Sequence, residues 1–185
     1  RKKEFKSEEK DLIFIYQGLI SPSRGIHSYV NAFKEQDKKL VLMGHILDGE
    51  EEMLKSIQEE SNIFYKKPVA IDQIVKNTSL ADCGLHVLGN NLSKSYEMSL
   101  PNKFFEYLHA GLPVIVNKEL EYLAGIVEEN NLGWIVSQEE LSSFIREITK
   151  EEILFRKEYI KSYSKGLFWE SDAKIFHQIY SQSRI

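Results

Sequence analysis

The stretch LPNKFFEYLHAGLPVIV, residues 100–116, decides the fold that we predict for this chain. Ser99 and Pro101 are typical of a helix start, where a hydroxyl can accept from free backbone amides and a missing N–H is no loss. Three large apolar residues then recur at helical spacing. Gly111 is expected to end the helix in the left-handed conformation. The β-branched run after Pro113 predicts a strand that is buried on both faces.

This predicted helix carries two groups that suit an anionic ligand with hydroxyls. Its N-terminus has free amides and a partial positive charge, and with Lys103 beside it such an end suits phosphate. Glu106 lies about one turn deeper, within reach of a pair of ribose hydroxyls. A surface glutamate on an amphipathic helix is the simpler interpretation of the same residue, so both remain open from the pattern alone.

Length and composition indicate one soluble globular domain of 185 residues, 42% of them hydrophobic and 28% charged. A net charge of −4 argues against a non-specific nucleic-acid surface. No apolar run approaches the ~20 residues of a membrane span, and no signal peptide is visible. The single cysteine, Cys83, fits a reducing compartment, so we expect a cytoplasmic protein. The scattered histidines suggest no metal site.

Short apolar runs alternate with amphipathic segments along most of the chain. This alternation predicts an α/β domain with a Rossmann-like, doubly wound parallel sheet of about six strands over residues 12–166. Residues 1–11 are almost entirely charged and are predicted to form a linker. Residues 167–185 carry an apolar stripe at helical spacing and are predicted to form a C-terminal helix.

The loop that follows the first predicted strand has its own pattern. It lacks the G-x-G-x-x-G spacing and the Walker lysine, so NAD and ATP sites of those kinds are not expected. Arg24 stands near the start of the next helix, which is unfavourable unless an anion is bound there. A guanidinium fork suits a diphosphate. Gly44, after the second strand, would lie at the sheet edge where such folds bind ligands.

Together these motifs resemble, as an ordered series over residues 13–180, the donor-binding half of GT4-type retaining glycosyltransferases, which have the GT-B fold. The resemblance assigns Glu106 to the ribose of a nucleotide sugar. It assigns the helix start, Asn102, Lys103 and Phe104, to the diphosphate.

The same resemblance covers the two loops nearest the N-terminus. The segment from Gly18 to Gly25 is similar to the family's G-x-L-x-x-x-(K/R)-G loop, in which the basic residue, here Arg24, meets the diphosphate. The loop after the third strand lies beside the nucleobase in that family. This assigns the segment from Tyr65 to Val69 to the base, with Tyr65 and Lys66 as its site residues. A plain strand-to-helix turn explains the segment equally well.

Two departures from the family pattern stand out. Leu19 occupies a position where many members have a second basic residue, so one phosphate contact is missing or comes from elsewhere. Many members also have a glutamate near the donor sugar, eight positions before the ribose-binding one. That position is Met98 here, so Glu97, nine positions before, is our candidate catalytic residue.

The resemblance implies transfer of a sugar from a UDP- or GDP-sugar to a glycan or other acceptor, without metal or cofactor. An N-terminal domain of the same protein would bind the acceptor, so this chain alone should bind donor weakly and transfer nothing. Two alternatives stay open: a nucleotide-sugar epimerase of related fold, and a non-catalytic nucleotide-binding domain. A strand order of 3-2-1-4-5-6 would support the transferase, and 2-1-3-4-5 would support a flavodoxin-like binding domain.

Overall fold

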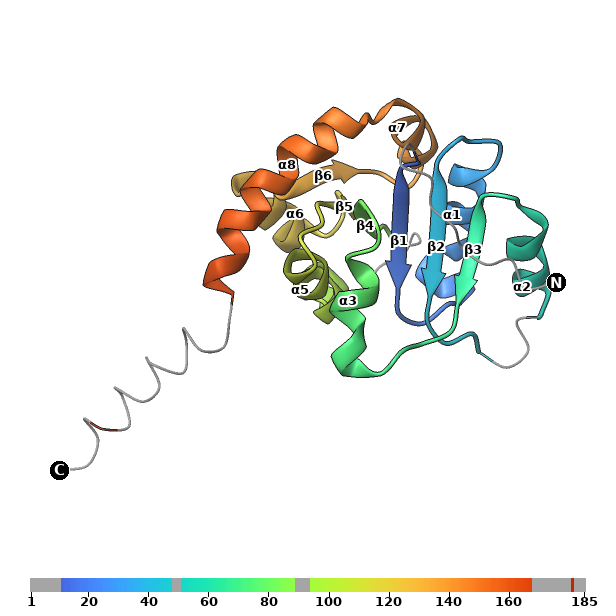
Figure 1. Cartoon of the computed structure of the whole chain (residues 1–185), viewed down its shortest axis with the longest axis horizontal. Helices are drawn as coiled ribbons and strands as arrows, with labels where there is room; N and C mark the ends of the chain where they lie inside the picture. Colours follow the sequence, from blue (N-terminus) through green and yellow to red (C-terminus); the bar gives the residue numbers. More distant parts are fainter. Residues whose placement is uncertain (1–10, 48–50, 89–93, 168–180, 182–185) are drawn as a thin grey trace.

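The computed structural model of the chain describes residues 11–47, 51–88, 94–167 and 181. Six parallel strands form one sheet in the order β3-β2-β1-β4-β5-β6 (Figure 1). The strands are β1 (Ile13–Gln17), β2 (Lys39–Met43), β3 (Ile63–Lys66), β4 (Cys83–His86), β5 (Val114–Asn117) and β6 (Gly133–Val136). This is the doubly wound Rossmann order. The predicted fold class is therefore confirmed, and the flavodoxin-like order is not observed.

Helices cover both faces of this sheet (Figure 1). One face packs against α1 (Ile26–Phe33), α2 (Glu51–Glu59) and α7 (Leu141–Glu147). The other packs against α5 (Asn102–His109) and α6 (Glu121–Glu129). The short helix α3 (Ile74–Thr78) lies beside α5 on this side, where Thr78 bonds to Gln17 of β1. The remaining elements are α4 (Lys94–Glu97), α8 (Lys150–Tyr163) and three short 3-10 helices, η1 (Pro22–Arg24), η2 (Ile71–Gln73) and η3 (Ser164–Gly166).

The two-residue period of β1 distributes its side chains between these two layers. Phe14 and Tyr16 join the core beneath α1, whereas Ile13 and Ile15 join the core beneath α5. Gln17, the last residue of the strand, faces the α5 side as well, because its side chain bonds to residues of α3 and α5. A buried polar residue therefore ends a strand that is otherwise apolar.

Tyr107 of α5 enters the sheet between β1 and β4. Its hydroxyl accepts from the backbone N–H of Gln17 at 3.1 Å and donates to the backbone carbonyl of Leu85 at 3.2 Å. Paired residues of β1 and β4 extend only as far as Ile15 and Gly84, so the hydroxyl takes over where the two strands part. Gly84 makes room for the ring, because a methyl group on its Cα would lie 2.5 Å from ring carbons of Tyr107.

The start of α5 differs from the prediction. The helix begins at Asn102, and Pro101 is its N-cap residue in an extended conformation. The prediction that Ser99 caps this helix is wrong, because the Ser99 hydroxyl donates to the carbonyl of Tyr96 at 3.0 Å. Gly111 follows the helix with φ of +76°, as expected for a left-handed helix end.

Two predicted segments, the linker over residues 1–11 and the helix over residues 167–185, lie almost wholly outside the described residues. Within the described ranges, no helix has both the length and the hydropathy to cross a lipid bilayer. The same ranges contain no group of three or more His, Cys, Asp or Glu side chains arranged to bind a metal ion.

We expect Gly84→Ala to lower the free energy of unfolding by about 1–3 kcal/mol, because the added methyl group overpacks the ring of Tyr107. Urea unfolding followed by circular dichroism measures this change. Gly125→Ala in α6 is the matched control, since a methyl group there meets nothing within 4 Å. The control should keep or slightly raise stability, by up to about 1 kcal/mol. Equal effects of the two substitutions would contradict the close packing at Gly84.

Candidate functional site

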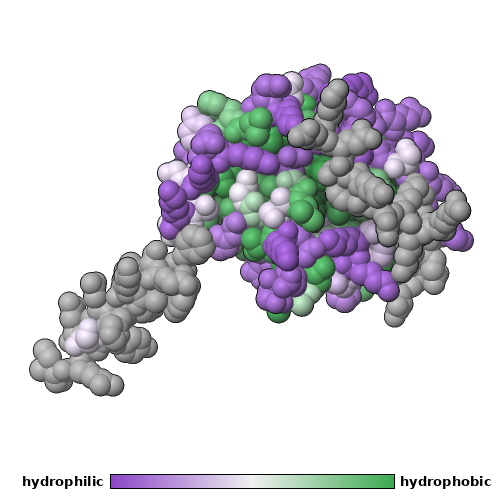
Figure 2. Space-filling model, viewed as in Figure 1, coloured by the Kyte–Doolittle hydropathy of each residue, from purple (hydrophilic) through white to green (hydrophobic). Residues whose placement is uncertain are grey.

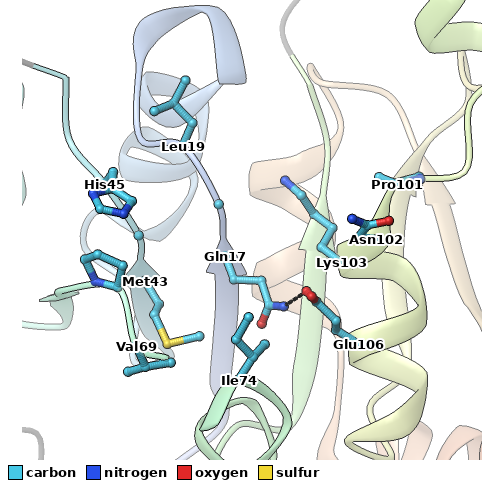
Figure 3. A pocket seen from close by; sticks show the side chains of 13 residues that line it. Gln17, Leu19, Met43, His45, Val69, Ile74, Pro101, Asn102, Lys103 and Glu106 are labelled. Atoms are coloured by element: carbon cyan, nitrogen blue, oxygen red, sulfur yellow. Dashed lines mark hydrogen bonds between the residues drawn. The ribbon is translucent and has the colours of Figure 1, made fainter. Parts of the chain in front are cut away.

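A cavity of about 440 Å³ lies at the carboxyl edge of the sheet (Figure 3). One wall is the first turn and a half of α5, and the opposite wall is formed by the ends of β1 and β2 and the segment that leads into α3. The lining residues are Gln17, Gly18, Leu19, Met43, Gly44, His45, Pro68, Val69, Ile74, Pro101, Asn102, Lys103 and Glu106. Both its size and its position are those of a small-molecule site in an open α/β sheet.

Five of the residues selected from the sequence line this cavity together: Gly18, Gly44, Asn102, Lys103 and Glu106. They come from the loops after β1 and β2 and from α5, which lie far apart along the chain. Parallel strands bring these segments together, because all their carboxyl ends meet at one edge of the sheet.

Tyr65 and Lys66 line a different cavity of about 340 Å³. The Tyr65 hydroxyl donates to the backbone at the end of β2 at 3.1 Å, and the Lys66 ammonium donates to Asn77. This second cavity reaches the sheet face that carries α3 and α5, where Figure 2 shows an apolar area framed by polar side chains. Tyr65 and Lys66 are therefore not in the cavity that contains Glu106, whereas Pro68 and Val69, at the end of the same predicted segment, do line it.

Phe104 and Arg24 also lie outside the lining of the main cavity. Phe104 is buried in the core, and its amide already donates to the Pro101 carbonyl at 2.9 Å. The guanidinium of Arg24 lies over the ring of Tyr96, 5.2 Å from its centroid. Glu97, which follows Tyr96 in the sequence, is half-buried at the end of α4. Arg24 and Glu97 thus belong to neighbouring elements, η1 and α4.

The loops after β1 and β2 touch backbone to backbone at the edge of the cavity. The Gly18 amide donates to the Met43 carbonyl at 3.0 Å. A methyl group on Gly44 would lie only 1.7 Å from the Gly18 carbonyl oxygen. The φ angles of +131° for Gly18 and +157° for Gly44 are in the range that other residues rarely adopt. The contact between these loops therefore requires a glycine at position 44, and the backbone conformation favours one at position 18.

Lys103 places a cation beside this pair of loops. Its Nζ lies 4.2 Å from the ring centroid of Tyr16, and a methyl group on Gly18 would be 3.4 Å away from it. Burial and the charge of Arg24 lower the pKa of Lys103 to about 7, although the nearby carboxylate of Glu106 acts in the other direction. A bound polyanion would favour the protonated form and raise this pKa.

Glu106 is held by side chains that sequence reasoning missed. The Gln17 amide nitrogen donates to its Oε2 (Figure 3), and the Thr78 hydroxyl donates to the Gln17 amide oxygen at 2.6 Å. A signal for Gln17 was present in the sequence. It ends an apolar strand at a position that faces the core, where a polar side chain needs a partner.

His86 is a second residue that sequence reasoning passed over. It ends β4, it is buried, and its Nδ1 has no hydrogen-bond partner in the part of the chain that the structure describes. Burial, together with the charges of Lys103 and Arg24, lowers its pKa to about 3, so the imidazole is neutral. The two cations, Lys103 and Arg24, concentrate positive potential at this edge of the sheet, and the neutral imidazole of His86 lies within its influence.

Comparison with known proteins agrees with this architecture. Residues 20–173 match the family model of the glucosyltransferase 3-like C-terminal domain. Curated protein sequences give no significant match. Among solved structures, HepE (Alr3699) of Anabaena in complex with UDP-glucose has a TM-score of 0.69 and 16% identity, over 92% of this chain and 49% of that chain.

Two further structures show the same similarity. Sucrose-phosphate synthase of Thermosynechococcus elongatus has a TM-score of 0.70 and 20% identity, over 93% of this chain and 45% of that chain. The C-terminal domain of LpcC, a group 1 glycosyl transferase of Francisella tularensis, has a TM-score of 0.64 and 14% identity, over 82% of this chain and 83% of that chain.

At these identities the solved structures establish the fold, which is that of the C-terminal half of GT-B glycosyltransferases. The chain spans about half the length of HepE. The family model, in contrast, covers most of this chain. The chain therefore belongs to the family of glucosyltransferase 3-like C-terminal domains.

Proposed function

We propose that this domain binds the nucleoside diphosphate of a sugar donor and is the donor half of a retaining, metal-independent, GT4-type glycosyltransferase. One observation carries the proposal: a single cavity holds the carboxylate of Glu106 and the ammonium of Lys103 on successive turns of α5. A carboxylate accepts hydrogen bonds from paired hydroxyls, and an ammonium donates to phosphate oxygens. A nucleotide sugar offers both kinds of partner.

The cavity suggests how the donor lies in it. The ribose is assigned to Glu106, and the diphosphate to Lys103 with the backbone at Gly18 and Asn102. Arg24 stands further along the same edge, where its charge acts on Lys103. The apolar wall opposite α5 is left for the nucleobase. UDP is the nucleotide we propose, because the HepE structure contains UDP-glucose.

Lys103 also accounts for the departure at Leu19. The loop after β1 lacks the second basic residue that many members of the resembled family have, and Leu19 lines the cavity in its place. The ammonium of Lys103 reaches this loop from α5 and lies beside Gly18. We infer that Lys103 supplies the phosphate contact that the loop itself lacks.

The acceptor is assigned to a further domain of the same protein, as the coverage of about half of HepE suggests. The isolated chain is then expected to bind donor weakly and to transfer nothing. A glycan or other acceptor and a role in polysaccharide biosynthesis follow from the family resemblance. A cytoplasmic location follows from the single cysteine, which fits a reducing compartment, and is part of the same proposal.

Glu106→Gln should weaken UDP binding by about tenfold or more, because charge-assisted hydrogen bonds to the ribose are lost. Isothermal titration calorimetry of the 185-residue chain with UDP measures the affinity. Glu121→Gln, at an exposed position of α6, is the matched control and should bind as the unchanged chain does. Equal affinity of the Glu106→Gln variant would remove the ribose assignment.

UDP binding at pH 8 should take up about one proton, because Lys103 is mostly neutral above its pKa of about 7 and regains its charge beside a diphosphate. The lysine is already protonated at pH 5.5, so its uptake should be absent there, and the terminal phosphate of UDP, which titrates at about pH 6, should release protons instead. Calorimetry in buffers of different ionisation enthalpy measures the number of protons. Lys103→Arg, which stays charged, should bind without uptake at either pH. Uptake that persists in this variant would assign the proton to another group.

Glu97→Gln should lower kcat by about 10² or more while UDP affinity stays unchanged, if the side chain acts on the donor sugar in the transition state. The test requires the two-domain enzyme with its acceptor, and the readout is sugar transfer together with UDP titration. A kcat equal to that of the unchanged enzyme would end the catalytic assignment of Glu97 and leave the donor site unaffected.

A further inference from the structure

Gln17 occupies the point where the sheet reverses its strand order. It is the last residue of β1, its side chain is 4% exposed, and its backbone amide donates to the Tyr107 hydroxyl between β1 and β4. Its side chain extends on the same face toward α3 and α5. This one residue is thus bonded through its backbone to Tyr107 and through its side chain to the neighbouring Glu106.

The orientation of the Gln17 amide follows from the chemistry of its two partners. A carboxylate only accepts hydrogen bonds, so the amide nitrogen faces Glu106. The amide oxygen faces the Thr78 hydroxyl, which donates to it at 2.6 Å and also lies 2.8 Å from the Ile74 carbonyl. With both ends bonded, the amide cannot rotate without losing a buried hydrogen bond.

We propose that Gln17 is a positioning residue for donor recognition, which holds the carboxylate of Glu106 in the orientation that receives the ribose hydroxyls. The inference rests on the proposed function, because it assigns Gln17 a role only in relation to the ribose. Glu106 is half-buried on one turn of a helix, and its free side chain would sample several rotamers. The Gln17 side-chain amide already holds one oxygen of the Glu106 carboxylate. Less conformational entropy of Glu106 is then lost when the nucleotide sugar binds.

Gln17→Glu isolates this role. The glutamate has the same length, and its carboxylate can still accept from Thr78. Only the group that faces Glu106 changes, from a donor to an acceptor with a negative charge. The two carboxylates then repel each other unless they share a proton. The carboxylate of Glu106 should turn away at high pH and return at low pH.

The readout compares UDP with 2′-deoxy-UDP, which lacks one ribose hydroxyl. The unchanged chain should prefer UDP by about tenfold. Gln17→Glu should lose most of that preference at pH 8 and recover part of it at pH 5. Gln36→Glu, the same change in the turn before β2 at the opposite edge of the sheet, is the matched control and should keep the preference at both pH values.

Other ionisable side chains near Glu106 are common to both proteins. They are Lys103 and Tyr107 of α5, Tyr16 of β1, Arg24 of η1, His86 of β4 and His45 after β2. The α3 residues that face this region, Ile74 and Thr78, do not ionise. Their effects on the two ligands are the same, so the ratio of the UDP and 2′-deoxy-UDP affinities reports on the ribose contact alone.

The outcomes separate the inference from the function it rests on. If the unchanged chain binds neither UDP nor another nucleotide, the proposed function fails, and the inference fails with it. If it prefers UDP and Gln17→Glu keeps that preference at pH 8, only the role of Gln17 is overturned. Should Gln17→Glu not fold, Gln17→Met decides, because it removes the donor without adding charge. A reduced preference at both pH values supports the inference, and an unchanged one overturns it.

Discussion

The site depends on the insertion of the Tyr107 hydroxyl between β1 and β4. The hydroxyl bridges the backbone N–H of Gln17 and the backbone carbonyl of Leu85. It thereby anchors α5 to the sheet where the strand order reverses. Lys103 lies four residues before Tyr107, on the same helix face, and Glu106 lies next to it. Anchoring one tyrosine therefore orients both the cation and the carboxylate of the cavity.

The charges at this edge are arranged so that an anion would stabilise them. Arg24 lies over the ring of Tyr96 and Lys103 lies over the ring of Tyr16, so each cation faces an aromatic ring. The lowered pKa values of Lys103 and His86 share a cause, since burial and neighbouring positive charge both disfavour protonation. In a chain with a net charge of −4, this local excess of positive charge is a property of the site. A diphosphate would relieve the repulsion that lowers the pKa of Lys103.

Glycine has a separate role at each of three contacts in this region. Gly84 admits the ring of Tyr107, and Gly44 admits the backbone of Gly18. Gly18 in turn leaves space beside the ammonium of Lys103. In each case the missing side chain allows an approach that a methyl group would block or crowd. These contacts hold together β1, β2, β4 and α5, whose residues are distant in the sequence. The ends of β1 and β2 and the start of α5 then line the cavity from opposite sides.

The sequence by itself determined the alternation of strands and helices, the left-handed end of α5 at Gly111, and the presence of Glu106 and Lys103 on one helix. Those features depend on local period and on local backbone preference, which neighbouring residues specify. Tertiary structure alone decided that Tyr65 and Lys66 lie outside the cavity that contains Glu106, that Ser99 does not cap α5, and that Glu106 is held by Gln17, which in turn is bonded to Thr78. These outcomes depend on which residues meet across the sheet, and no periodic pattern encodes a contact between positions 17, 78 and 106.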